Sequence, residues 1–99
     1  MGAPGSVVWS REAELDLARI HRFVQQQWSD RMAERFLDLV MEFEDVVLQY
    51  PRGFKTSPIR PDLHIGIIHR NVSAIYSIEP DHVLIVSLID TRADNAPFL

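Results

Sequence analysis

The sequence predicts an α+β domain in which a short strand, two long helices and three further strands follow one another. Three observations support this. A β-branched and aromatic run lies near the start, two stretches with helical spacing of apolar residues follow, and the last third alternates apolar runs with turn residues. At 99 residues the chain supports one core. We expect the order β-α-α-β-β-β, with an antiparallel helix hairpin packed on a twisted, mainly antiparallel sheet.

The first strand and first helix are predicted within residues 6–28. Ser6 to Trp9 is a short run of strand-forming residues. Ser10 follows at the position of a helix N-cap, with Glu12 and Glu14 in the first turn, where the helix dipole favours negative charge. The helix then presents one apolar face made of Ala13, Leu17, Ile20, Val24 and Trp28.

The second helix is predicted from about Arg31 to Gln49. Ser29 and Asp30 interrupt the first helix and can cap the second, and so short a connection makes the two helices antiparallel. Pro51 disfavours a helical conformation at Tyr50 and ends the element. The second helix has a wide apolar face, which is enough to pack on more than one neighbouring element. This face consists of Ala33, Phe36, Leu37, Val40, Phe43, Val47 and Tyr50.

Three strands are predicted after a loop over residues 51–61. They cover Leu63 to Ile68, Val72 to Ile78 and Val83 to Ile89, each a short apolar or alternating run. Residues 69–71 supply the first turn, and Pro80-Asp81 suits the centre of a type I turn for the second. The three strands therefore form an antiparallel meander.

Composition narrows the classes of function. The 46% hydrophobic and 24% charged residues are ordinary for a soluble globular protein, and no apolar run is long enough for a membrane span. Residues 1–50 carry five Arg against nine acids, and residues 51–99 carry five Lys and Arg against five acids. This balance opposes broad electrostatic binding of nucleic acid, so we expect no sequence-specific DNA binding by this chain alone. Residues 1–5 are expected to be a flexible tail, and residues 6–99 the single domain.

Motifs for common chemistries are missing. There is no cysteine, no HExxH motif and no EF-hand loop, and we expect neither a metal nor a cofactor. The absence of cysteine fits a cytoplasmic protein. No GxSxG motif is present, and the four glycines are scattered rather than grouped into a phosphate-binding loop. The remaining candidates for a functional site are Arg60, His64, Arg70, Tyr76 and Arg92. An exposed Arg near an acidic residue, however, most often forms a surface ion pair. A Tyr within a strand most often belongs to the hydrophobic core.

Three segments together resemble the RelE/ParE superfamily of bacterial toxins, in its ParE-like branch. They are VVWSREAELDLARIHRFV, RMAERFLDLVMEFEDVVLQYPRGF and VSAIYSIEPDHVLIVSLIDTR, which share with the family their order and spacing. The resemblance covers about Val7 to Asn95. It implies the β-α-α-β-β-β fold and the toxin half of a type II toxin–antitoxin system, such as those that stabilise plasmids.

The superfamily implies two activities. RelE-like members cleave messenger RNA in the ribosome with basic residues of the sheet, whereas ParE-like members poison DNA gyrase without hydrolysis. Where the former carry lysines on the second strand, this chain has His64 and Gly66, and where they carry an Arg early in the third strand it has Ser73. Because fixed positive charge is needed at the phosphate, these replacements disfavour the RNase reading.

We therefore expect a ParE-like inhibitor of DNA gyrase, neutralised by a small, partly disordered cognate antitoxin. Target contacts are assigned to Arg60, Arg70 and Arg92. Antitoxin contacts are assigned to the wide face of the second helix, namely Phe36, Val40, Phe43 and Val47. If the chain is instead a RelE-like endoribonuclease, the catalytic candidates are His64, Tyr76 and Arg92. A degenerate homologue that only binds an antitoxin is the third alternative.

Overall fold

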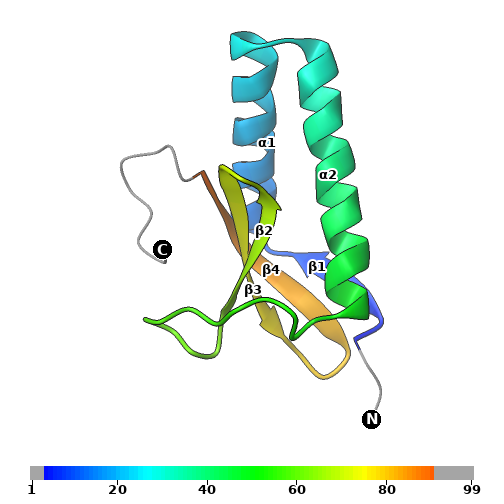
Figure 1. Cartoon of the computed structure of the whole chain (residues 1–99), viewed down its shortest axis with the longest axis vertical. Coiled ribbons are helices and arrows are strands. Elements are labelled where there is room, and N and C mark those ends of the chain that lie inside the picture. The colour runs from blue at the N-terminus through cyan, green and yellow to red at the C-terminus, as the bar shows by residue number, and fades with distance from the viewer. Residues whose placement is uncertain (1–3, 91–99) are drawn as a thin grey trace.

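The structure is a computed structural model and describes residues 4–90. Its elements follow the predicted order and confirm the predicted α+β fold. They are β1 (Ser6–Trp9), α1 (Arg11–Gln27), α2 (Asp30–Gln49), β2 (His64–His69), β3 (Val72–Ile78) and β4 (His82–Asp90). Figure 1 shows α1 and α2 standing side by side as a hairpin, with the sheet below and beside them.

Both helices begin where their capping residues predict. The Ala13 N–H donates to Ser10 Oγ at 3.0 Å, and the Met32 N–H donates to Ser29 Oγ at 3.1 Å. Each serine thereby satisfies one of the amide groups that a helix leaves unpaired in its first turn. Two residues separate the helices, so α2 returns antiparallel to α1.

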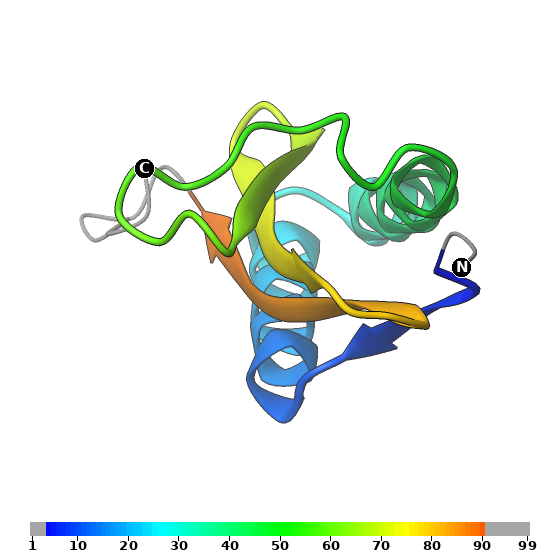
Figure 2. The ribbon, with the colours of Figure 1, turned by 90° about the horizontal axis from the view of Figure 1, so that it is seen from below.

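The sheet has the strand order β1-β4-β3-β2 and is mixed. β2, β3 and β4 form the predicted antiparallel meander, whereas β1 pairs in parallel with β4 at the edge. The first and last strands of the described chain are therefore neighbours, and the turned view of Figure 2 shows β1 running beside β4. Trp9 ties this edge to the helices, because its Nε1–H donates to Glu44 Oε2 at 2.7 Å.

β1 is shorter than β4, and α1 completes the uncovered part of the edge. β1 pairs only with residues 82–85 of β4. Beyond them, the Ser10 hydroxyl donates to the Val86 carbonyl at 2.7 Å, and the Leu88 N–H donates to Asp16 Oδ2 at 3.0 Å. Side chains from the start of α1 thus take the hydrogen bonds that a longer β1 would have made.

The main core lies between the helix hairpin and one face of the sheet. It is built from the inward residues of both helices and from alternate residues of the strands, among them Ala13, Ile20, Phe36, Val40, Phe43, Val47, Ala74, Tyr76, Val83 and Ile85. A second, smaller cluster consists of Leu63, Ile65, Ile75 and Ile89. Ile65 and Ile75 face each other across β2 and β3.

Two predicted members of the apolar helix faces lie at the surface instead. Trp28 is the C-cap residue of α1 and is 66% exposed, and Tyr50 is the C-cap residue of α2 and is 62% exposed. Both continue the helical spacing, but the backbone has left the helix at these positions, so the side chain no longer follows the buried stripe. The prediction that they belong to the packed faces is wrong.

Candidate functional site

The C-terminal half of α2, which is the lower half in Figure 1, packs tightly on the sheet through an aromatic cluster. The ring of Phe43 lies over Gly66, where a Cβ atom would come within 2.5 Å of the phenyl ring. Phe43 also meets Phe54 and Tyr76, with ring centroids 5.6 and 6.2 Å away. His64 stacks on Tyr76 at 5.1 Å. No space is left in this cluster for a side chain at position 66.

The polar atoms of His64 and Tyr76 hold the loop between α2 and β2. The Tyr76 hydroxyl donates to the Pro51 carbonyl at 2.6 Å, and His64 Nδ1 lies 3.0 Å from the Phe54 carbonyl, so this ring nitrogen carries the proton. Burial raises the pKa of Tyr76 to about 12. Because a buried phenol that is bonded to a backbone carbonyl gives up its proton reluctantly, Tyr76 is poorly suited to proton transfer at neutral pH.

The predicted cations do not converge. Arg60 donates from Nε and Nη2 to both carboxylate oxygens of Asp62, at 3.1 and 2.8 Å, on the exposed loop before β2. Arg70 follows β2, so the strand of about 20 Å separates the two arginines. Arg92 lies outside the described residues. The described chain therefore brings no pair of these arginines together.

The four residues predicted to contact an antitoxin are core residues. Phe36, Val40, Phe43 and Val47 are between 0 and 6% exposed and lie in the main core between α2 and the sheet. A partner could reach Val40, Phe43 and Val47 only if α2 left the sheet, whereas Phe36 also lines a pocket between α2 and the β2–β3 turn. The wide apolar stripe of α2 is thus explained by packing within the chain, and its assignment to antitoxin contacts stays a prediction.

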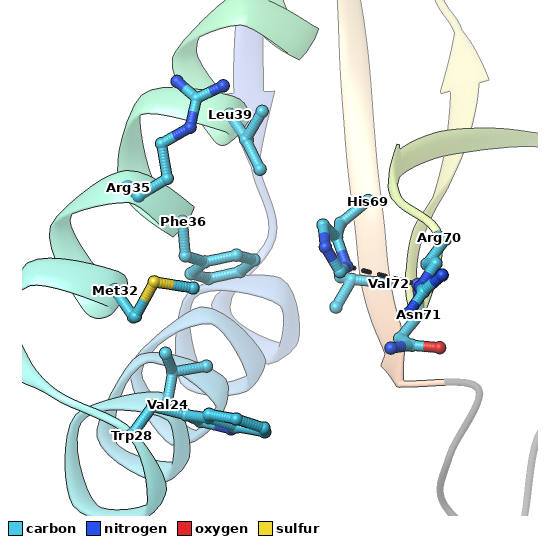
Figure 3. Close-up of a pocket in the computed structure, with 10 residues that line it drawn as sticks. All are labelled: Val24, Trp28, Met32, Arg35, Phe36, Leu39, His69, Arg70, Asn71 and Val72. Carbon is cyan, nitrogen blue, oxygen red and sulfur yellow. Dashed lines mark hydrogen bonds between the residues drawn. The ribbon is translucent and has the colours of Figure 1, made fainter.

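A pocket opens where the N-terminal half of α2, the upper half in Figure 1, stands away from the sheet. We name this cavity of about 340 Å³ the hairpin-tip pocket, because it lies between the tip of the helix hairpin and the turn joining β2 to β3. Figure 3 shows Met32 and Phe36 on the helix side facing His69 and Val72 across it. Its full lining is Val24, Trp28, Met32, Arg35, Phe36, Leu39, His69, Arg70, Asn71 and Val72.

The pocket combines an apolar wall with a cationic rim. Arg35 and Arg70 contribute the permanent charges, and no acidic residue lines the cavity. Among the described residues, the one ion pair of Arg35 is a long contact of 3.5 Å between its Nη1 and Glu42 Oε2. Within residues 4–90, Arg70 has no ion pair. These features suit a ligand that is apolar and negatively charged.

The sequence analysis identified only part of this pocket. The sequence predicts Val24 and Trp28 on the apolar face of the first helix, Phe36 on that of the second, and Arg70 as a target contact, and all four line the pocket. A usable signal was present in a second apolar stripe on α2, formed by Met32, Leu39 and Val46 at seven-residue spacing, which lies to one side of the buried stripe. The turn residues that close the other wall are brought there by the sheet and carry no such signal.

Other kinds of site are not found in the described part of the chain. Among residues 4–90, no three His, Asp or Glu side chains gather in a way that could hold a metal ion. No helix there is long and apolar enough to span a bilayer.

Comparison with known proteins gives a family and a fold. A family model described as the ParE toxin of the type II toxin–antitoxin system, parDE, matches residues 7–95. A solved structure described as a chromosomal ParDE toxin–antitoxin system from P. aeruginosa superimposes with a TM-score of 0.76 at 18% identity. That alignment covers 90% of this chain and 98% of the other. No curated protein matches the sequence.

Proposed function

The chain belongs to the ParE toxin family of type II toxin–antitoxin systems, and from this premise we propose that it poisons DNA gyrase by binding it, without a catalytic step of its own. An antitoxin that covers part of its surface would hold it inactive. Because gyrase acts on the chromosome, the proposal places the protein in the cytoplasm.

The observation that carries the non-catalytic proposal is the closed aromatic cluster. A basic side chain at position 66 has no room, because the Phe43 ring occupies the space over Gly66. The Tyr76 hydroxyl and His64 Nδ1 are hydrogen-bonded to carbonyl groups of the loop backbone. On the opposite face of the sheet, Ser73 is buried between its neighbours Ile67 and Ile89. These positions of the described sheet therefore offer little fixed positive charge with which to stabilise a phosphate during cleavage.

The proposed contact with gyrase uses exposed cations. Arg70 stands at the β2–β3 turn without an ion pair among the described residues, so its charge is available to an acidic partner surface. Arg60 would first have to release Asp62. Since an exposed ion pair contributes little, this exchange has a small cost. Arg92 is retained in the proposal as the third cation.

The experiment is a supercoiling assay with purified protein, gyrase, ATP and relaxed plasmid. We expect loss of supercoiling activity and, after detergent and protease treatment, linear plasmid from trapped cleavage complexes. R70A and R92A should weaken both effects, and R22A, an exposed substitution on α1, serves as the matched control.

Unimpaired gyrase in the presence of folded protein would contradict the proposal. A parallel reaction with translating ribosomes would then show whether message is cleaved, which would establish the RelE-like alternative. Failure of both reactions, with retained antitoxin binding, would identify a degenerate homologue.

A further inference from the structure

The loop between α2 and β2 is long, and hydrogen bonds fix its path. It spans residues 50–63 and extends sideways from the lower end of β2 in Figure 1. The Ser57 N–H donates to the Leu63 carbonyl at 2.8 Å. Ser57 Oγ accepts two further backbone N–H groups, those of Ile59 and Arg60. Connections of this length without a helix or strand are uncommon in small domains and are often functional.

The loop presents positive charge at fixed positions. Arg52, Lys55 and Arg60 are exposed. Asp62 is the single acidic residue of the loop, which therefore has a net charge of +2 in a chain with a net charge of −4. Arg60 is paired with this acid. Arg52 and Lys55 have no ion pair among the described residues, so their charges are available to a partner.

The residue types of the loop favour DNA over protein as its partner. Lys is depleted at protein–protein interfaces, whereas Lys, Arg, Thr and Tyr all donate hydrogen bonds to the phosphate oxygens of DNA. Lys55 is the only lysine of the chain, and Thr56 beside it is exposed. Tyr50, at the start of the loop, is 62% exposed and carries a further hydroxyl donor. With Arg52, four donors of the kinds that bind phosphate thus lie close together in the sequence.

From these observations we infer that the α2–β2 loop contacts the phosphate backbone of the DNA that gyrase holds, with Arg52 and Lys55 as the principal contacts. The toxin therefore binds the gyrase–DNA complex more tightly than gyrase alone. This inference rests on the proposed function, because it takes gyrase as the target. Arg60, in the same loop, is one of the cations proposed to contact gyrase, so the loop lies where the protein and DNA surfaces of the target meet.

The net charge of the chain explains why this contact needs gyrase. Outside the loop the chain carries a net charge of −6, because the loop contributes +2 to a total of −4, and this charge repels free DNA. Gyrase binds both the toxin and the DNA, so the loop meets phosphates without a long-range attraction. Because a ligand stabilises the state to which it binds more tightly, a toxin that touches both enzyme and DNA favours their assembled complex. This agrees with the trapped cleavage complexes expected above.

The test compares the affinity of the toxin for gyrase alone with its affinity for gyrase bound to a linear DNA duplex, by biolayer interferometry with immobilised toxin. R52Q/K55Q removes the two unpaired charges of the loop. R11Q/R22Q is the matched control, because it removes two exposed charges from α1 and changes the net charge equally. Thermal melts confirm that both variants fold.

We expect the unmodified toxin and R11Q/R22Q to bind the gyrase–DNA complex at least about tenfold more tightly than gyrase alone. In R52Q/K55Q this preference should fall below about threefold, while the affinity for gyrase alone stays the same. The logarithm of the preference should fall with the logarithm of the salt concentration with a slope of about −2 in the unmodified toxin, and this slope should vanish in R52Q/K55Q. The free duplex should bind weakly to all three proteins, and tight binding there would overturn the requirement for gyrase.

Four further outcomes would overturn the inference. Equal affinity of the unmodified toxin for gyrase with and without DNA would remove the DNA contact and leave the proposed function intact. An unchanged preference in R52Q/K55Q would place the DNA contact outside the loop. Loss of affinity for gyrase alone in this variant, with the preference kept, would assign the loop to an acidic surface of gyrase. Absence of binding to gyrase in either form would overturn the inference and the proposed function together.

Discussion

The two halves of α2 meet the sheet in opposite ways. In the lower half, the ring of Phe43 fills the space above Gly66 and touches Phe54 and Tyr76. In the upper half, Met32 faces the β2–β3 turn across an unfilled pocket. The same helix thus provides a closed interface at one end and an open one at the other.

The difference shows that an apolar helix stripe does not by itself mark a partner site. The buried stripe of α2 packs on the sheet of its own chain, because a glycine on β2 lets the helix approach closely. The neighbouring stripe with Met32 instead faces the pocket, whose opposite wall is the β2–β3 turn. Stability is therefore expected to depend more on the closed half than on the open half.

The largest test of this comparison is F43A. Removing the ring leaves a cavity between α2, the loop and the sheet, and we expect the free energy of unfolding to fall by about 3–5 kcal/mol. Urea denaturation followed by circular dichroism measures the change. M32A at the open half should alter it by about 0.5 kcal/mol or less. Similar losses for the two variants would contradict the division of α2.

G66A tests the same contact from the strand. The added methyl group must displace the Phe43 ring, and we expect a loss of about 1–3 kcal/mol in the free energy of unfolding. G5A is the control, because a Cβ there meets no atom closer than 4.0 Å. A G66A protein as stable as the unmodified chain would mean that the ring moves aside freely.

The hydroxyl of Tyr76 gives a pH-dependent effect. Burial raises its pKa to about 12, whereas a tyrosine in an unfolded chain titrates near about 10. Because the folded state holds this proton more tightly, its contribution to stability is complete below about pH 10 and is lost as the pH rises towards 12.

Unfolding curves recorded between pH 9 and pH 12 measure this loss. Y76F should remove the corresponding part of the slope and cost about 1 kcal/mol at neutral pH, because the Pro51 carbonyl loses its donor. An unchanged slope in Y76F would assign the alkaline loss to other groups.

The smallest effect is expected from R60Q. Arg60 and Asp62 hold each other on an exposed loop, and their hydrogen bonds lower the pKa of the Asp62 carboxyl. Exposed pairs of this kind change stability little, so the denaturation midpoint should stay nearly constant. A clear shift would show that the loop before β2 contributes more to the closed half than its contacts suggest.

The elements of the fold could be predicted because their signals are local. Ser10 and Ser29 act as caps within three residues of their partners, and the helix faces repeat along one segment. The pocket could not be predicted in this way, because its two walls are about forty residues apart in sequence. The sequence also carries no local signal that Gly66 lies under Phe43, although that contact decides which half of α2 packs closely on the sheet.

The hydrogen bonds from Ser10 and Asp16 to β4 have a consequence for self-association. A strand with unpaired backbone groups at a sheet edge recruits strands from other molecules, and many proteins protect such edges with charge. Here the outer edge of β4 beyond Ile85 is hydrogen-bonded at Val86 by the N-cap residue Ser10 and at Leu88 by Asp16 of α1. These hydrogen bonds thus protect the β4 edge from pairing with a strand of another molecule. They are present only while α1 remains docked on the sheet.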